Sequence, residues 1–314
     1  MRRVIRRRGR AAIAAAVALA VGLPVAASGT TPVAGTAAEV ARLVSASQHA
    51  TALPATAAAQ LASASSDTAA RMFPKTASGC AARGQCILGD TASSTTVALL
   101  GDSHALMWLP AVVRIATALK LRVELYYLDY CPAASVDVWV YLAHSADTQC
   151  SVDRREWISW LDAQHPAAIL LSDRTYMVHT AASGGTQLFT ATQWRTGLES
   201  TIAALRPSGA SIAVIGDLVT FDTPIPECLA AHPSAMLACS VPNPNRARPG
   251  LQPAERAAAR AEKAPYVDPT PWLCRRRCAP VIGGFIAYYD QNHISATYAQ
   301  YLSGVLGAAL RAVV

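Results

Sequence analysis

The sequence has little charge of either sign and no basic patch beyond its first residues. Only 15% of the 314 residues are Asp, Glu, Lys or Arg, and the formal net charge is +7. Six arginines between Arg2 and Arg10 supply almost all of this excess, so the rest of the chain is nearly neutral. Arg275, Arg276 and Arg277 form a later cluster, but three arginines flanked by cysteines are typical of a solvated loop. The sequence therefore predicts no binding to nucleic acid.

The chain also lacks an internal repeat and a clear membrane span. Its basic first residues are followed by an apolar run over 11–23 and by small residues up to Ser28. This order predicts a secretory signal peptide over residues 1–27. The apolar run is short for a membrane span, but with residues 25–27 included it could persist as an anchor. We therefore expect a secreted or extracytoplasmic protein, and we keep open membrane anchoring by its N-terminus.

Large apolar side chains are scarce in residues 28–78, which are rich in Ala, Thr, Ser and Pro. Such a composition can bury little surface, so this segment is predicted to be a linker with short helices near 37–47 and 55–70. Residues 79–314 have the length of one domain with one core.

Cysteine is well represented, with eight residues that fall into four close pairs. An even number behind a signal peptide favours disulfides, although eight cysteines allow 105 connectivities. Zinc is the alternative, because Cys274 and Cys278 lie close together, but no histidine lies at ligand spacing. We expect no metal, and four disulfides between sequence neighbours. The pairs are Cys80 and Cys86, Cys131 and Cys150, Cys228 and Cys239, and Cys274 and Cys278.

Short apolar runs alternate with amphipathic segments through the rest of the chain. Such alternation is typical of a parallel sheet with helices on both faces. A proline-rich insertion over 217–253 interrupts the alternation, and loops of that length are often lids or binding loops. Strands are expected at 97–100, 123–127, 168–171 and 211–215, and helices at 104–120, 152–164, 190–205, 254–263 and 295–310.

The first of these strands ends in Gly101-Asp102-Ser103. In open α/β sheets ligands bind at the carboxyl edge, and the turn places the Ser103 hydroxyl there. The helix that follows points its N-terminal amides at the same place, where the Ser103 amide could stabilise an oxyanion. Alone, however, Gly-Asp-Ser is a common turn.

A second motif, Asp290-Gln291-Asn292-His293, precedes the last helix. A serine hydroxyl is a poor nucleophile unless a base accepts its proton, and a histidine oriented by a carboxylate can do so. At a spacing of three, Asp290 can reach Nδ1 of His293 while Nε2 faces a serine. Taken alone the pair is weak evidence, because either residue can simply cap a helix or solvate a loop.

With both motifs in one domain, the chain resembles the SGNH (GDSL-like) hydrolases. It is most similar to the SGNH domain fused to family 3 membrane acyltransferases, which O-acetylate surface glycans. The matching segments are 101–105, 108–111, Cys131-Pro132, 267–274 and 289–293. The resemblance implies a three-layer α/β/α sandwich with a mainly parallel, flavodoxin-like sheet. It also implies that Ser103 is the nucleophile, with His293 as base and Asp290 as its orienting carboxylate.

The chain departs from this superfamily at the other oxyanion donors. The superfamily has a glycine after its second strand and Gly-x-Asn-Asp after its third, whereas this chain has Leu128-Asp129-Tyr130 and Ser172-Asp173-Arg174. We expect oxyanion or substrate contacts from Ser103, with Asp102, Ser172, Asp173 and Arg174 as further candidates. An ordinary surface turn is the alternative for residues 172–174. His104 is expected to be a first-turn helix residue whose side chain points away from Ser103.

The resemblance implies an exported serine esterase or O-acyltransferase that acts on O-acyl groups, chiefly O-acetyl, of an extracytoplasmic glycan without a cofactor. Its partners would be the acylated glycan or acyl donor and a separate membrane acyltransferase that delivers the donor. Transfer to a sugar hydroxyl and hydrolysis by water stay equally open. The alternative is a non-catalytic glycan-binding or accessory domain that retains the fold.

Overall fold

The computed structural model describes residues 33–176, 178–243 and 251–314, and its backbone is built around a six-stranded sheet. The strand order is β1-β3-β2-β6-β8-β10; only β1 is antiparallel to its neighbour. The five parallel strands therefore lie in the flavodoxin-like order, second-first-third-fourth-fifth. The strands are β1 (Ile87–Gly89), β2 (Thr96–Gly101), β3 (Arg122–Tyr127), β6 (Ala168–Ser172), β8 (Ser211–Ile215) and β10 (Tyr266–Val267).

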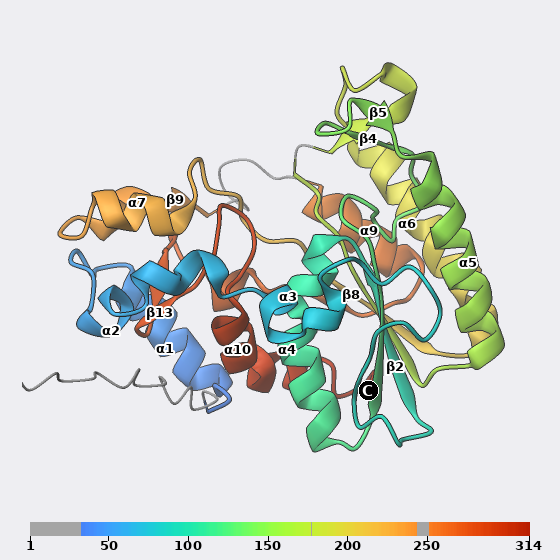
Figure 1. Cartoon of the computed structure of the whole chain (residues 1–314), viewed down its shortest axis with the longest axis horizontal. Coiled ribbons are helices and arrows are strands. Elements are labelled where there is room, and N and C mark those ends of the chain that lie inside the picture. The colour runs from blue at the N-terminus through green and yellow to red at the C-terminus, as the bar shows by residue number, and fades with distance from the viewer. Residues whose placement is uncertain (1–32, 177, 244–250) are drawn as a thin grey trace, which may run out of the picture. The chain divides into compact units, whose positions relative to one another are not determined.

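Helices cover both faces of this sheet (Figure 1). Side chains alternate between the faces along each strand. In β2, Val97 and Leu99 enter one core, whereas Ala98 and Leu100 enter the other. This arrangement confirms the predicted three-layer α/β/α fold. One layer contains α4 (Ser103–Ala118) and α10 (Ala296–Ala309), and the other contains α5 (Thr148–Gln164), α6 (Ala191–Leu205) and α9 (Gln252–Ala261).

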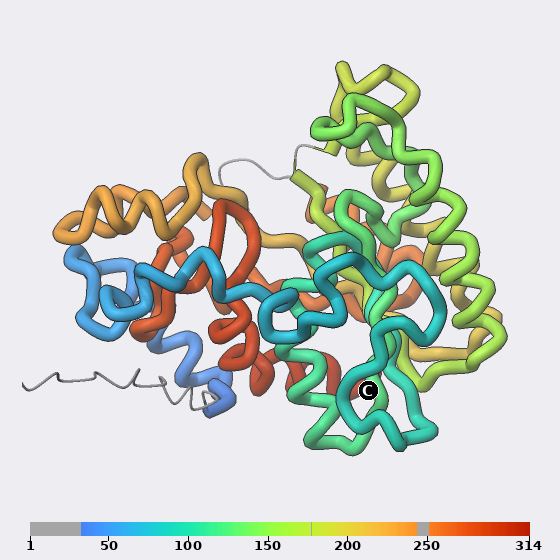
Figure 2. Tube along the Cα trace, viewed as in Figure 1, coloured from blue at the N-terminus to red at the C-terminus, as the bar shows by residue number. Residues whose placement is uncertain are grey.

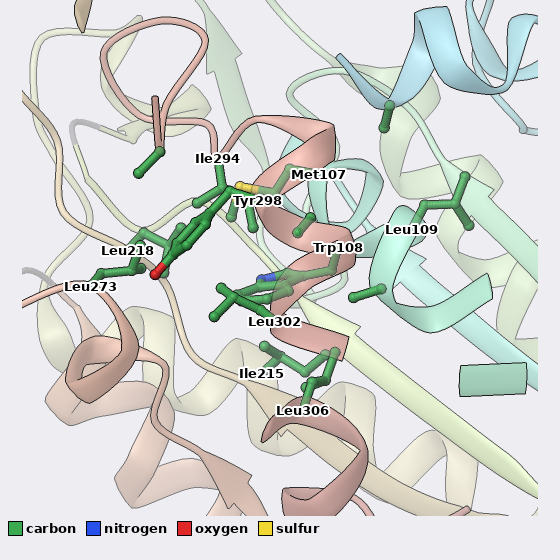
Figure 3. Close-up of a cluster of buried hydrophobic side chains, with 14 of the residues drawn as sticks. Met107, Trp108, Leu109, Ile215, Leu218, Leu273, Ile294, Tyr298, Leu302 and Leu306 are labelled. Atoms are coloured by element: carbon green, nitrogen blue, oxygen red, sulfur yellow. The ribbon is translucent and has the colours of Figure 1, made fainter. Parts of the chain in front are cut away.

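The core between α4 and α10 fixes how the two ends of the domain meet. Trp108 of α4 packs with Leu302 and Leu306 of α10 and with Ile215 at the end of β8 (Figure 3). All four side chains are buried. Because α10 lies along α4, the loop that precedes α10 is brought to the N-terminal end of α4.

The helices and main-sheet strands predicted within residues 79–314 are all present, as is the helix near 37–47, whereas the stretch near 55–70 holds only short helical turns. Side-chain caps explain where several helices begin. Thr190 closes a capping box with Gln193 at the start of α6, and Ser295 caps α10. Helix α5 begins at Thr148, four residues earlier than predicted, because the side chain of Asp147 accepts a hydrogen bond from the amide of Cys150.

The described part of the predicted linker packs onto the domain. Val40 and Val44 of α1 (Ala37–Ser47) are buried in the same core as α10. Figure 2 shows this N-terminal segment running beside the last part of the chain. Small side chains do not prevent burial here, because they let short helices approach the domain closely. The other elements of the segment are α2 (Ala55–Ala58), η1 (Leu61–Ser66), α3 (Ala69–Met72) and η2 (Pro74–Thr76).

Several short elements were not expected from the sequence. A three-stranded sheet has the order β5-β4-β7, from β5 (Ser145–Ala146), β4 (Val138–Val140) and β7 (His179–Thr180). The insertion after β8 contains α7 (Ile225–Ala231), η5 (Met236–Cys239) and β9 (Val241–Pro242). The remaining elements are η3 (Ala181–Ser183), η4 (Arg206–Ser208), η6 (Thr270–Trp272), β11 (Arg277–Cys278), β12 (Val281–Ile282) and β13 (Phe285–Ile286).

All eight cysteines are paired in disulfides, in the four neighbour pairs that the sequence predicts. The signal peptide predicted over residues 1–27 lies outside the described residues. Within the described ranges, no helix is both long and apolar enough to cross a membrane.

Candidate active site

The site forms where the strand order of the sheet reverses. Strand β3 lies on one side of β2 and β6 on the other, so the connections that follow β2 and β6 diverge at this point. Gly101 pairs with Ser172, which makes the carboxyl ends of the two strands level. Such a switch point is the usual ligand crevice of an open α/β sheet.

The turn after β2 is tied to the turn after β6 through Asp102. One carboxylate oxygen, Oδ1, accepts a hydrogen bond from the amide of His104 (2.8 Å) and thereby caps α4. The other, Oδ2, accepts from the amide of Arg174 (3.0 Å). Ser103 is thus the first residue of α4, and its own N–H has no acceptor within the helix.

The loop before α10 brings two more side chains to Ser103. Nε2 of His293 lies 2.8 Å from Oγ of Ser103, across 190 residues of sequence. Nδ1 of His293 lies 2.7 Å from Oδ2 of Asp290. Oδ1 of Asp290 accepts from the amides of Asn292 and His293, both at 2.8 Å. A carboxylate, an imidazole and a hydroxyl therefore form one hydrogen-bonded chain.

The charge of Asp290 determines which nitrogen of the His293 imidazole carries the proton. Burial raises the pKa of Asp290. This effect is outweighed by the hydrogen bond and charge interaction with His293 and by hydrogen bonds from two backbone amides, so the pKa lies below its usual value. An ionised carboxylate only accepts hydrogen bonds, so Nδ1 of His293 carries the proton. Nε2 is then free to accept the proton of the Ser103 hydroxyl, which is the requirement for serine nucleophilic catalysis.

Two rings hold the His293 imidazole in place. The ring of Tyr289 stacks on it at 5.3 Å between centroids, with 6° between the planes. The ring of His104 meets it at 4.8 Å in an edge-on arrangement. Fixed rings reduce the rotation that would separate Nε2 from Ser103.

The insertion after β8 supports the same loop from outside. The amide of Phe221 donates to the carbonyl oxygen of Gln291 (2.7 Å), and the amide of Ile225 donates to that of Asp290 (3.2 Å). In its described part, this insertion therefore holds the loop that carries His293.

A second buried pair lies behind His293 and was missed in the sequence. Nδ1 of His104 lies 2.6 Å from Oδ1 of Asp217, and both side chains are buried. The amide and hydroxyl of Thr175 donate to Oδ2 of Asp217 at 2.7 and 2.8 Å. Burial lowers the pKa of His104, but the charge and hydrogen bond of Asp217 outweigh it, so the pKa is raised. The side chain of His104 thus bonds away from Ser103, as expected for a first-turn residue.

The sequence does indicate where Asp217 and Thr175 lie, although not that Asp217 pairs with His104. Asp217 follows the predicted strand 211–215 and Thr175 follows 168–171, so both stand at the same edge as Ser103. Glu255 of α9 is buried beside them and accepts a hydrogen bond from the amide of Asp217 (3.2 Å). Burial, with the nearby charge of Asp217, raises the pKa of Glu255 well above its usual value.

The other candidates for oxyanion or substrate contact meet at the same edge but differ in exposure. The carboxylate of Asp173 accepts hydrogen bonds from the amides of Ala133 (2.6 Å) and Ala134 (3.0 Å). Like Asp102, it therefore fixes the backbone of a neighbouring loop. Ser172 is only 1% exposed, so its hydroxyl does not face an open surface. Arg174 is half-buried and lines a pocket beside Asp102.

Comparisons with known proteins bear on the family and the fold of the chain. A family model described as "SGNH domain (fused to AT3 domains)" matches residues 68–307. No curated protein sequence matches the chain. The periplasmic domain of lipopolysaccharide acetyltransferase from Salmonella ser. Paratyphi A is similar in fold, with 13% identity over 70% of this chain and 83% of that chain and a TM-score of 0.51. A GDSL-like lipase from Bacteroides thetaiotaomicron VPI-5482 matches at 10% identity over 70% of this chain and 89% of that chain, with a TM-score of 0.42.

Proposed function

Because the chain belongs to the family of SGNH domains that are fused to AT3 domains, we propose that it cleaves or transfers O-acyl groups through Ser103, His293 and Asp290. The observation that carries the proposal is the hydrogen-bonded chain from Asp290 through His293 to Ser103. Its position at the switch point of the sheet, where substrates have access, adds support.

The proposed reaction has two steps. Oγ of Ser103 attacks the acyl carbonyl while Nε2 of His293 takes the hydroxyl proton, and His293 then returns this proton to the departing alcohol oxygen. In the second step water or a sugar hydroxyl attacks the acyl-serine and loses its proton to His293, which passes it to Oγ of Ser103 as the acyl–Oγ bond breaks. Asp290 keeps Nδ1 protonated and stabilises the imidazolium that forms in each step.

The negative oxygen of the tetrahedral intermediate needs donors that are already in place. The amide of Ser103 supplies one, since it is the first amide of α4 and lacks an acceptor within the helix. The positive end of the α4 dipole points to the same place.

The substrate that fits best is an O-acetylated glycan outside the cytoplasm. The family description pairs this domain with AT3 domains, which supports an acyl donor delivered by a membrane acyltransferase. Four disulfides support an oxidising, extracytoplasmic compartment. Acetate would be released if water is the acceptor, and a newly acetylated sugar would form if a glycan is.

The proposal is tested with the small ester p-nitrophenyl acetate. Ser103→Ala and His293→Ala should each abolish nearly all turnover, and the double variant should be hardly slower, because both changes disable the same step. Asp290→Asn should lower the rate on the order of 10⁴-fold with the fold unchanged.

Matched controls for this experiment are Ser78→Ala and His232→Ala, since both residues are exposed. Both controls should keep wild-type turnover. Near-wild-type turnover by Ser103→Ala would instead favour a non-catalytic accessory domain.

A further inference from the structure

An aromatic cluster lies on one face of the small sheet β5-β4-β7. Trp139 and His179 are directly paired across β4 and β7, so their side chains stand on the same face. Tyr141, two residues beyond Trp139, joins them, with its ring 5.1 Å from that of His179. Figure 1 shows β4 and β5 together, near one end of α5 and α6.

The Trp139 ring is held in position by a glycine. Gly185 has φ +79°, and a Cβ added to it would lie 2.3 Å from Cδ1 of the Trp139 indole. The backbone therefore packs directly against the ring, which only glycine permits at this approach. The aromatic surface is thus formed in advance of any ligand.

This cluster forms one wall of a pocket that reaches Asp102, the residue before the proposed nucleophile. The pocket has a volume of about 410 Å³, within the range of small-ligand sites. Asp102, the residue before Ser103, and Arg174 line its inner side. Tyr141 (60% exposed) and Leu142 (80% exposed) stand at its open side.

The lining also contains polar side chains. Arg174 and His179 are half-buried and both line the pocket, so they can offer hydrogen bonds to an occupant. A sugar ring offers hydroxyls to polar groups at its edge and a C–H face that packs on aromatic rings. The combination of an aromatic wall and these two polar side chains therefore fits a carbohydrate better than a fatty acyl chain.

We propose that this pocket is the subsite for a sugar ring of the glycan whose O-acyl group lies at Ser103. The inference rests on the proposed function for the identity of the reacting group. The aromatic wall and the polar side chains of Arg174 and His179 carry the binding of the sugar itself.

Binding is measured with the Ser103→Ala protein, so that no probe is consumed. O-acetylated xylo-, chito- and manno-oligosaccharides are titrated while tryptophan fluorescence, which includes Trp139, is followed. We expect saturable binding of at least one probe, and a Kd about tenfold weaker when Tyr141→Ala is added. Leu142→Ala should also weaken binding.

The matched control is Leu119→Ala. Leu119 is 53% exposed and follows the C-terminal end of α4, about 24 Å along the helix from Ser103. The Leu119→Ala variant should leave the Kd for the oligosaccharide unchanged. Absence of binding by every probe, or a Kd that Tyr141→Ala does not change, would overturn the subsite.

A kinetic experiment separates this inference from the proposed function. With Ser103 intact, Tyr141→Ala should lower kcat/KM for an acetylated oligosaccharide about tenfold relative to p-nitrophenyl acetate, mainly through KM. A selective loss on p-nitrophenyl octanoate would identify an acyl-chain pocket and refute the sugar subsite. Oligosaccharide binding that depends on Tyr141, in a protein that neither hydrolyses an acetyl ester nor transfers its acetyl group to a sugar, would refute the catalytic proposal and leave the subsite standing.

Discussion

At the scale of single residues, Gly101 is required by the strand beside it. Its φ is +147°, and a Cβ would lie 2.0 Å from the carbonyl oxygen of Ser172 and 2.8 Å from Oδ1 of Asp173. Backbone atoms of a central strand cannot move aside. The turn that presents Ser103 thus depends on this position having no side chain.

We predict that Gly101→Ala lowers the free energy of unfolding by about 3 kcal/mol or more, because the clash adds to the strain of the backbone conformation. Gly209→Ala is the matched control: φ is +74°, but nothing lies within 4 Å of its added Cβ. That control should cost about 1 kcal/mol. Urea denaturation measures both, and equal losses would contradict the role of the clash.

We expect Asp173 to make the stability of the protein depend on pH. Burial, then the charge of Asp102, raises its pKa to about 7, although the amides of Ala133 and Ala134 oppose this. Between pH 3.8 and about 7 the folded protein therefore holds a proton that the unfolded chain has released. The stabilisation from this carboxyl is therefore fully present below pH 3.8 and is lost as the pH rises through about 7.

Asp173→Asn removes this titration. The difference in unfolding free energy between wild type and variant should therefore shrink as the pH rises from about 4 to 7, by up to about 1.4 kcal/mol per pH unit. Urea denaturation at a series of pH values measures it. A difference that stays constant with pH would show that Asp173 is ionised in the folded protein throughout.

At the scale of elements, the segment between β3 and α5 is anchored at its base. The Cys131–Cys150 disulfide joins the end of the β3 loop to the first turn of α5. The guanidinium of Arg154 donates to the carbonyl oxygens of Pro132 and Val136. These bonds hold the small sheet, and with it the aromatic wall, over the switch point.

We predict that Cys131→Ala combined with Cys150→Ala lowers the free energy of unfolding by about 3 kcal/mol, from the loop entropy that the disulfide removes from the unfolded chain. The pair Cys274 and Cys278 closes a much shorter loop, with a separation of 4 residues against 19. Its removal should cost about 2 kcal/mol on the same basis. Denaturation without reductant compares the two, and a larger loss for the shorter loop would contradict the entropic account.

At the scale of the whole molecule, the segment before residue 68 buries side chains in the core of the domain. Val44 is fully buried, whereas Val33 is 83% exposed. We predict that Val44→Ala costs about 2 kcal/mol and that Val33→Ala costs almost nothing. Thermal or urea unfolding measures both. Equal, negligible effects would mean that the segment is a linker after all.

The sequence by itself determined the features that depend on local physics. Apolar runs and helical periodicity gave the alternation of strands and helices, and cap residues such as Ser295 gave helix ends within a few residues. The spacing of the cysteines gave the four disulfides. The motif residues Ser103, Asp290 and His293 were identified from sequence, and the structure brings them into contact; their catalytic role is still a proposal.

The tertiary structure alone decided what depends on contacts between distant residues. His104 and Asp217 lie 113 positions apart, and nothing local to either indicates the pair. Strands of two or three residues, such as β7, are too short to show a period in the sequence. The composition of residues 28–78 predicts a linker, and composition alone does not encode the surface against which α1 packs. The pocket beside Ser103 arises from the same cause: its walls come from separate segments that only the folded backbone brings together.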